Sequence, residues 1–581
     1  MLFKSFSKRD YCFLFIALVL IVGQVWLDLT MPDYTANLTR SVSSGNLQMS
    51  DIWYNGLMML LCALGSLACS LCCGFLVAHI ASSFSKVTRK RLFGKITTFS
   101  STEINRFGAP SLITRTTNDV DHLHRFIAMG LQMIIKAPIL AVWAICKISV
   151  SSFEWTLATG ICVAVIVVFV SIIVLLCIPK FKKVQKLTDN LNNATRENLS
   201  GVRVVRAFNA EEYQEKKFDE ANVNLMKNQL FTAKATGLIS PVLTICLNGL
   251  TLAIYWIGAV LINNAQIIER ATIIGNMTAF TQYALQVVFA FMMLIFMFII
   301  LPRVIVSAKR INEVLRAEPV INESKSNDKP AEKEGEVEFK NVSFCFPDGA
   351  SNALEDISFK IEKGETVAFI GATGSGKTTI LDLLERVYDV SSGEVLVDGK
   401  NVKEFSFKQL QSKISMVSQK AVLFKGTIKS NITYGADEEV ADDDERLKAA
   451  IEISEAGFVY DLDGGVNAHV AQGGTNFSGG QKQRISIARA IFKGSEIIVF
   501  DDSFSALDYK TDATIRGKIR QQLKDKTIII VAQRIGTIIN ADKIIVIDDG
   551  KIVGIGKHKE LLETCSLYNE IALSQLSKEE L

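Results

Sequence analysis

The sequence carries little net charge and few charged side chains for its length. Its 63 Lys and Arg residues against 60 Asp and Glu leave a formal charge of +3 at pH 7, spread along the chain, which excludes the concentrated basic surface of a nucleic-acid-binding protein. Charged residues make up only 21% of the 581 residues, and hydrophobic residues make up 49%. A soluble protein of this length is more polar, so the composition predicts a membrane portion and more than one domain.

The sequence also lacks the cysteine pattern of a disulfide-bonded extracellular protein. Nine of the eleven cysteines lie inside apolar runs and are interpreted as small buried hydrophobic residues: Cys12, Cys62, Cys69, Cys72, Cys73, Cys146, Cys162, Cys177 and Cys246. The cluster at 69–73 has only His79 nearby, which argues against a metal site. No small-residue cleavage site follows the first hydrophobic run, so we interpret that run as a retained membrane span.

Six apolar runs are long enough to cross a bilayer, near residues 11–31, 54–80, 127–150, 156–178, 238–262 and 276–301. Lys and Arg concentrate in the loops after the second and fourth runs, whereas the loops on the opposite side contain only Arg40 and Arg270. This asymmetry predicts that both termini are cytoplasmic.

The two basic loops keep a helical pattern, so we expect the second to fifth spans to continue as helices beyond the bilayer. Turn-rich patches at Ser111–Asp121 and Gly201–Glu211 interrupt these hairpins. Each patch is a candidate short coupling helix, with a solvated loop as the alternative.

Polar side chains inside the predicted spans are costly in lipid, so they should face protein or a water-filled cavity. They are Asp28, Gln132, Lys136, Lys147, Asn248, Gln282 and Gln286. Lys147 could instead extend outward to the interface. The sixth span gathers Phe289, Phe291, Met292, Met293, Phe296, Met297 and Phe298. These side chains suit a tolerant apolar binding wall, or ordinary packing against lipid and core.

One stretch, GATGSGKTT at Gly371–Thr379, indicates a particular ligand. It follows an apolar strand at 367–370 and precedes a helix that begins at Lys377, so its backbone N–H groups face a helix N-terminus and can cradle phosphates. Lys377 can reach the outer phosphates and the Thr378 hydroxyl can ligate Mg²⁺. A plain glycine-rich turn is the alternative, and the strand and helix context argues against it.

A polar, proline-punctuated linker at 317–335 divides the chain. It separates an α-helical transmembrane domain, 1–316, from an α/β P-loop nucleotide-binding domain, 336–581. Further motifs accompany the phosphate loop: FCFP around Phe346, MVSQ ending at Gln419, NFSGGQ at Asn476–Gln481, a buried strand ending in Asp501 and Asp502, SALD at Ser505–Asp508, and VAQR around Gln533.

These motifs, in this order, resemble the nucleotide-binding domain of ATP-binding cassette (ABC) transporters, and six spans with long hairpins resemble a type IV exporter half. The resemblance covers nearly the whole chain, and Phe477 stands where Leu is usual. It implies a dimer in which each of two ATP molecules lies between the phosphate loop of one chain and the SGGQ segment of the other.

The resemblance also implies roles for individual residues. Phe346 would stack on adenine, Gln419 would sense Mg²⁺, and Asp501 would hold Mg²⁺ through water. The implied nucleotide-binding residues are Phe346, Gly371, Thr373, Gly374, Ser375, Gly376, Lys377, Thr378, Thr379, Gln419, Ser478, Gly479, Gly480 and Gln481, and the implied Mg²⁺ ligands are Thr378, Gln419 and Asp501.

Two catalytic positions depart from the family pattern. The family places Glu after the Mg²⁺ carboxylate to polarise the attacking water, and this chain has Asp502, one methylene shorter. The family's switch histidine is replaced by Gln533, which cannot carry the charge of an imidazolium. We therefore expect a degenerate site, with Asp502, Gln533 and Gln419 as its catalytic group, that binds ATP and hydrolyses it poorly.

The SGGQ segment at Ser478–Gln481, the signature motif of the family, is intact. An intact signature suits a heterodimer whose second half-transporter chain carries the catalytic Glu and the switch His. The leading hypothesis is ATP-driven export of amphipathic compounds, cationic drug-like molecules among them, across a bacterial cytoplasmic membrane. The alternatives are a lipid or peptide exporter subunit, or an ATP-binding channel or regulatory subunit that does not hydrolyse ATP. The six spans exclude a soluble ATPase acting on nucleic acid.

Overall fold

The structure is a computed structural model that describes residues 6–44, 48–149, 153–322, 334–347, 349–436 and 438–576. The described residues form two compact units, one within Met1–Thr97 and Ala109–Ala317 and the other within Thr98–Gly108 and Glu318–Leu581. The predicted linker begins at this division, and its residues 323–333 lie outside the described parts of the chain.

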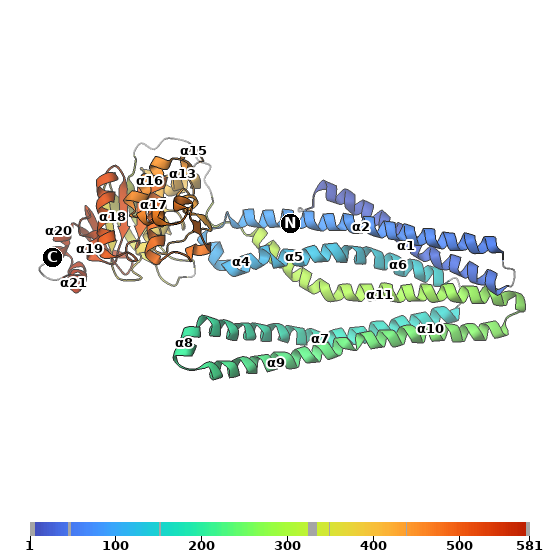
Figure 1. Cartoon of the computed structure of the whole chain (residues 1–581). Coiled ribbons are helices and arrows are strands. Elements are labelled where there is room, and N and C mark those ends of the chain that lie inside the picture. The colour runs from blue at the N-terminus through green and yellow to red at the C-terminus, as the bar shows by residue number, and fades with distance from the viewer. Residues whose placement is uncertain are drawn as a thin grey trace. The chain divides into compact units, whose positions relative to one another are not determined.

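Long helices make up the first unit (Figure 1). They are α1 (Lys8–Ser43), α2 (Met49–Ile96), α4 (Ala109–Thr116), α5 (Asn118–Arg125), α6 (Leu131–Ser149), α7 (Phe153–Ser200), α8 (Val202–Ala207), α9 (Glu211–Gly237), α10 (Ile239–Asn264) and α11 (Ile267–Arg316), with a π-helical turn, η2 (Phe126–Gly130), ahead of α6. In the described chain, 6 helical stretches are long and apolar enough to cross a membrane, and they coincide with the predicted spans. The prediction of six membrane helices is confirmed.

These helices are longer than a bilayer requires. Helices α2 and α7 each contain 48 residues. At about 1.5 Å per residue such a helix is roughly 72 Å long, against about 30 Å for the hydrocarbon core of a bilayer. The helices therefore continue well past any membrane they cross, as the periodicity of the basic loops predicts.

The core of the first unit forms where α1, α2, α6, α7, α10 and α11 meet. Of the apolar side chains in the predicted wall on α11, Phe291 and Met292 pack against this core. Phe289 and Phe296 are 47% and 49% exposed, and the side chain of Phe298 lies outside the described residues. Some side chains of the predicted wall therefore pack into the core and others are exposed. The role of the wall in binding stays a prediction.

Short helices lie at the hairpin ends. Helix α8 lies within the predicted patch 201–211 and joins α7 to α9 (Figure 1). The patch 111–121 instead forms the end of α4 and the start of α5, and a further short helix, α3 (Ser101–Phe107), precedes it. Three local features accompany α3: the cap at Ser100, the left-handed Gly108 with φ 75°, and Pro110 in the first turn of α4. Coupling roles for these helices stay predictions.

The second unit is an α/β fold. Its strands are β1 (Val337–Phe344), β2 (Leu354–Ile361), β3 (Thr366–Ile370), β4 (Ser392–Val397), β5 (Lys400–Asn401), β6 (Ile414–Val417), β7 (Gly426–Thr427), β8 (His469–Val470), β9 (Ile497–Asp501), β10 (Thr527–Val531), β11 (Lys543–Asp548) and β12 (Lys551–Gly556). Besides α3, its helices are α12 (Lys377–Leu384), α13 (Phe407–Lys413), α14 (Ile428–Ile432), α15 (Glu438–Ala441), α16 (Asp444–Ile453), α17 (Gly479–Lys493), α18 (Tyr509–Gln522), α19 (Ile535–Ile538), α20 (His558–Thr564) and α21 (Ser566–Gln575).

The six-stranded sheet of this unit has the order β12-β11-β3-β10-β9-β6, and only β12 is antiparallel to its neighbour. Both faces of the central strands are buried, because successive residues of β10 pack into two separate cores. This explains why the strands are continuous apolar runs. Since β3, β10, β9 and β6 are parallel neighbours, the loops at their carboxyl ends meet along one edge of the sheet.

Candidate functional site

The phosphate loop connects β3 to α12, as predicted. Gly374 and Gly376 have φ values of 88° and 103°, which L side chains rarely adopt. Gly376 is also packed closely, because a Cβ there would lie 2.6 Å from Leu354 Cδ2. The first residue of α12 is Lys377, so the loop ends at a helix N-terminus, where backbone N–H groups favour an anion.

The Lys377 ammonium folds over this loop. Its Nζ donates to the carbonyl oxygens of Gly371 at 3.0 Å and Ala372 at 2.6 Å, and to Ser375 Oγ at 3.2 Å. Burial lowers the pKa of Lys377, and the carboxylates of Asp502 and Asp501 oppose that shift. The loop thus holds a buried cation at the position where phosphate oxygens would lie.

Asp501 lies beside this loop at the end of β9. It is 5% exposed, and its Oδ1 and Oδ2 are each 3.4 Å from Thr378 Oγ1. Burial raises the pKa of Asp501, although the Thr378 hydroxyl acts in the opposite direction. In the described part of the chain no three His, Cys, Asp or Glu side chains form a metal-binding group. A Mg²⁺ ion held here would therefore depend on phosphate and water oxygens as well as Asp501 and Thr378.

The next residue, Asp502, accepts hydrogen bonds from two side-chain amides. Its Oδ2 accepts hydrogen bonds from Gln419 Nε2 at 3.1 Å and from Gln533 Nε2 at 3.0 Å. The backbone of Asp502 is left-handed, with φ 45°, and its N–H donates to Val531 O at 2.9 Å. The three residues predicted as a catalytic group lie together because β6, β9 and β10 end side by side.

Sequence reasoning missed Gln575, which holds the loop that carries Gln533. Gln575 Nε2 donates to the backbone oxygen of Gln533 at 2.8 Å, and its Oε1 accepts from the backbone N–H of Ile535 at 2.8 Å. A glutamine near the end of α21 belongs to no motif, so only the folded structure reveals this contact.

Phe346 lies just past β1 and is 37% exposed. Its ring packs edge-on against Phe344 and Tyr388, with centroids 4.9 Å and 5.5 Å away. These neighbours fix the ring while leaving part of it accessible, as an aromatic that stacks on a base requires.

The SGGQ segment forms the N-terminus of α17. Ser478 is the N-cap: its Oγ accepts from the Gln481 N–H at 3.3 Å, while its own N–H donates to Gln481 Oε1 at 2.9 Å. Ser478 and Gly479 are exposed. In the part of the chain that the structure describes, no hydrogen bond joins residues 478–481 to the phosphate loop. The phosphate loop, Asp501, Asp502, Gln419 and Gln533 therefore lie together in the described chain, whereas the segment 478–481 makes no hydrogen bond to the loop and exposes Ser478 and Gly479.

Comparison with known proteins identifies the family. Residues 14–291 match the ABC transporter transmembrane region, and residues 354–505 match the ABC transporter family. The uncharacterized ABC transporter ATP-binding protein YfiB of Bacillus subtilis (strain 168) is 34% identical over 583 residues, which cover 99% of this chain and 98% of that protein. The chain belongs to the ABC transporter family. As a member, it is a multi-pass membrane protein with an ATPase-type domain.

Two further proteins are similar to this ABC transporter over most of its length. An uncharacterized ABC transporter ATP-binding protein of Mycobacterium tuberculosis (strain ATCC 25618 / H37Rv) is 38% identical over 519 residues, 89% of this chain and 87% of that one. The ATP-dependent lipid A-core flippase of Hahella chejuensis (strain KCTC 2396) is 29% identical over 538 residues, 88% and 86% of the two chains.

A solved structure supports the fold. A bacterial Atm1-family ABC exporter with ATP bound superimposes with a TM-score of 0.79 and covers 97% of this chain and 98% of that chain at 22% identity. The ABC transporter therefore has the predicted fold class, a helical membrane domain followed by an α/β nucleotide-binding domain.

Proposed function

We propose that this ABC transporter is the degenerate-site subunit of a heterodimeric ATP-driven exporter. The observation that carries the proposal is the shared acceptor at Asp502, whose Oδ2 binds the amides of both Gln419 and Gln533. A carboxylate that is one methylene short and accepts two hydrogen bonds is a poor general base for water. Loss of a well-placed general base costs on the order of 10²–10⁴ in rate.

Gln533 adds to this deficit. Its amide can donate a hydrogen bond to a γ-phosphate, but it cannot become a cation as histidine can. Binding of ATP requires neither a general base nor a cation at these two positions, because the loop N–H groups and Lys377 would hold the phosphates and the ring of Phe346 would stack on adenine. Mg²⁺ would be held by Asp501, Thr378 and Gln419.

The signature segment serves the partner's site in this proposal. Ser478, Gly479 and Gly480 present a hydroxyl and N-terminal amides of α17 outward, which suits a γ-phosphate held by a second chain. That second half-transporter carries Glu and His at the positions equivalent to Asp502 and Gln533. Hydrolysis then occurs on its phosphate loop, against residues 478–481 of this chain.

The proposed cargo is an amphipathic small molecule, moved across a bacterial cell membrane with both termini in the cytoplasm. The cytoplasmic placement is supported by the Lys and Arg content of the loops after the second and fourth spans. ATP binding would favour one orientation of the membrane domain, and hydrolysis would reset it.

Lipid export is a second candidate, favoured by the similarity to a protein named as a lipid A-core flippase. A subunit that binds ATP without any hydrolysis in its assembly is a third, and the exposed signature argues against it. The two exporter candidates share one ATPase mechanism and differ in cargo, so an ATP-dependent lipid-translocation assay beside a dye-efflux assay separates them.

The decisive experiment compares ATPase rates in lipid. The chain is purified alone and after co-expression with the product of an adjacent transporter gene. We expect near-zero turnover alone and robust turnover together. Robust turnover of the chain alone would show that Asp502 and Gln533 are competent, and the heterodimer proposal would fail.

A further inference from the structure

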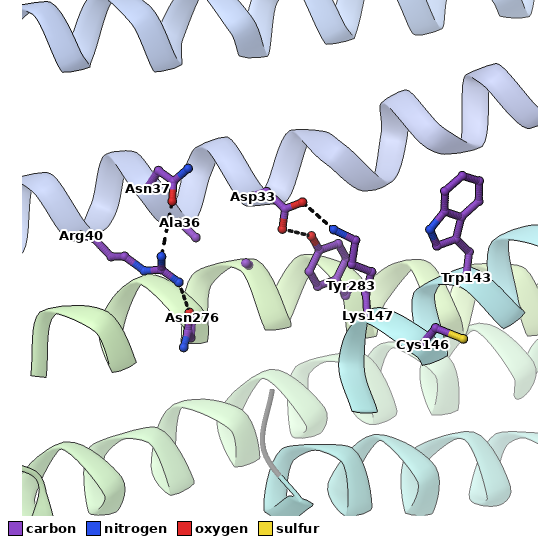
Figure 2. Close-up of a pocket in the computed structure, with 10 residues that line it drawn as sticks. Asp33, Ala36, Asn37, Arg40, Trp143, Cys146, Lys147, Asn276 and Tyr283 are labelled. Carbon is purple, nitrogen blue, oxygen red and sulfur yellow. Dashed lines mark hydrogen bonds and ion pairs between the residues drawn. The ribbon is translucent and has the colours of Figure 1, made fainter. Parts of the chain in front are cut away.

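A cavity of about 590 Å³ lies among α1, α6 and α11 of the first unit (Figure 2). Asp33 and Arg40 on α1, Trp143 and Lys147 on α6, and Tyr283 on α11 contribute to its lining. Its volume falls in the range of sites that hold small organic molecules. We infer that this cavity binds an amphipathic organic anion and that Arg40 is the anchor for its charged group.

The single carboxylate of the lining is already neutralised. Asp33 Oδ2 lies 2.7 Å from Lys147 Nζ, and Asp33 Oδ1 lies 2.5 Å from the Tyr283 hydroxyl. The ammonium of Lys147 also lies over the Tyr283 ring, 5.9 Å from its centroid. A cationic ligand would have to break this ion pair to reach Asp33, so the acidic side of the cavity does not provide a cation site.

A proline inside α1 supports this arrangement. Pro32 has no N–H to donate to the carbonyl of Asp28, one turn earlier. Gln286 of α11 replaces that donor, with its Nε2 3.0 Å from Asp28 O. Tyr283, one turn before Gln286, has its hydroxyl 3.1 Å from Leu29 O. These two hydrogen bonds tie the backbone of α1 at Asp28 and Leu29 to α11 beside the cavity.

Arg40, in contrast, has only neutral partners. Its guanidinium donates to Asn37 Oδ1 at 3.4 Å and to Asn276 Oδ1. Its Nε is buried without a hydrogen-bond partner. No carboxylate of the described chain forms an ion pair with Arg40. Arg40 is half-buried, and a partly desolvated cation without a counter-ion is costly, so an anionic ligand would relieve that cost.

The neighbouring backbone is adapted to this side chain. Gly275 precedes Asn276 on α11, and a Cβ at Gly275 would overlap Arg40 Cγ and lie 2.7 Å from Ala36 O. Because Gly275 has no side chain, the Arg40 side chain can pack directly against the backbone of α11, and its guanidinium reaches Asn276. The guanidinium is held in position and is not a freely moving surface group.

The charge balance and shape decide the ligand class. The lining has two cations, Arg40 and Lys147, against one carboxylate, Asp33. A guanidinium offers a planar fork that matches carboxylate, sulfonate or phosphate oxygens. The rings of Trp143 and Tyr283 provide contact for an apolar body. That the bound anion is exported cargo rests on the proposed function, whereas its binding does not.

The test uses two dansyl probes that differ only in charge. These are 11-(dansylamino)undecanoic acid and the matching 11-carbon primary amine, each titrated into the full transporter in phosphatidylcholine nanodiscs without nucleotide. Energy transfer from tryptophan to dansyl reports binding. We expect saturable transfer from the acid only, with most of its amplitude lost in Trp143→Phe because that indole lines the cavity.

Two variants isolate the anchor, and one is a matched control. Arg40→Gln removes the cation, and the near-isosteric Asn276→Asp supplies an internal counter-ion to Arg40. Both variants should raise the Kd for the acid by more than about tenfold. Arg270→Gln removes an arginine that is absent from the lining and should leave the Kd within about twofold. Asn276→Asp keeps the test valid if Arg40→Gln does not fold.

The outcomes are distinguishable. Equal affinity for acid and amine, or an unchanged Kd in Asn276→Asp, would overturn the anion site. Displacement of the acid by phosphatidylglycerol supports a lipid source for the anion, and displacement only by a free alkyl sulfonate supports a soluble organic acid. Binding is measured without ATP, so a failed ATPase experiment leaves this result standing, and saturable binding without transport would contradict only the cargo role.

Discussion

Gln533 Nε2 donates to Asp502 Oδ2 over 3.0 Å, across two loops that follow the neighbouring parallel strands β10 and β9. The same oxygen accepts from Gln419 on the loop after β6. In this geometry the side chain that should activate water is engaged by neutral amides from both sides. The two departures from the family pattern are therefore one structural unit, and they should be tested together.

Restoring both positions should restore hydrolysis. In the double variant Asp502→Glu/Gln533→His, the longer carboxylate can reach the attacking water and the imidazole can bear charge. We expect the turnover at this site to rise by at least about 10². The measurement is ATPase activity of the assembly whose partner site is inactivated by replacing its catalytic Glu with Gln. Turnover that stays at background, while ATP still binds, would contradict the degenerate-site proposal.

Gln575 should tune nucleotide affinity from outside the motifs. In Gln575→Ala the loop that carries Gln533 loses two hydrogen bonds that join it to α21. Each bond contributes about 0.5–1.5 kcal/mol, or about 1–3 kcal/mol for the pair, so the Kd for Mg-ATP should rise roughly 5- to 150-fold. Fluorescent ATP titration without hydrolysis measures this change. Gln522→Ala, at the exposed end of α18, is the matched control, and an equal effect there would show that Gln575 has no special role.

Stability should fall as pH rises through the titration of Glu385. Burial raises its pKa to about 7, and the nearby carboxyl of Asp382 contributes to the increase. The folded state therefore holds a proton that the unfolded chain loses near pH 4.5, and the stabilisation disappears as pH rises from about 4.5 to about 7. Asp382, with its pKa raised by burial to about 6, acts in the same direction.

The variant Glu385→Gln removes this dependence. It should unfold at a higher temperature than wild type at pH 8 and at nearly the same temperature at pH 4, where the wild-type side chain is mostly protonated in both the folded and the unfolded state. The difference at pH 8 corresponds to on the order of 3 kcal/mol. Thermal unfolding of the full chain in detergent at both pH values measures it, with the exposed Glu394→Gln as control. A constant offset at both pH values would contradict the assignment.

The fold and the positions of the proposed ATP-site residues were predictable from sequence where local rules decide. Apolar runs locate the membrane helices because lipid requires them, and the glycines at 374 and 376 locate the phosphate loop because their φ values exclude other residues. The parallel order of β3, β10, β9 and β6 then brings the predicted residues together.

Other features depend on long-range contacts that a single sequence does not reveal. Gln575 meets Gln533 across 42 positions, and Gln286 meets Asp28 across 258. Arg40 is recognisable as an anchor only when Asn276 and Gly275 are known to lie beside it. Helix α3 was missed for a different reason: its cap at Ser100 and its stop at Gly108 are equally typical of a loop.

The ion pair between Asp28 and Lys136 should show strong coupling. Lys136 Nζ lies 3.1 Å from Asp28 Oδ2, and Ser66 Oγ donates to Asp28 Oδ1 at 2.5 Å. Both charges lie within membrane-spanning helices, so Lys136→Met leaves a carboxylate without its counter-ion in an apolar environment. Since the two side chains are only 20% and 28% exposed, the loss should be about 2–4 kcal/mol.

Neutralising both partners should recover much of that loss. Asp28→Asn/Lys136→Met removes the uncompensated charge, and the amide oxygen introduced by Asp28→Asn would still accept the Ser66 hydrogen bond. We therefore expect the double variant to be more stable than Lys136→Met alone, measured as the midpoint of heat-induced aggregation in detergent. If the two single losses simply add in the double variant, the two charges do not interact, and Asp28 is held by Ser66 alone.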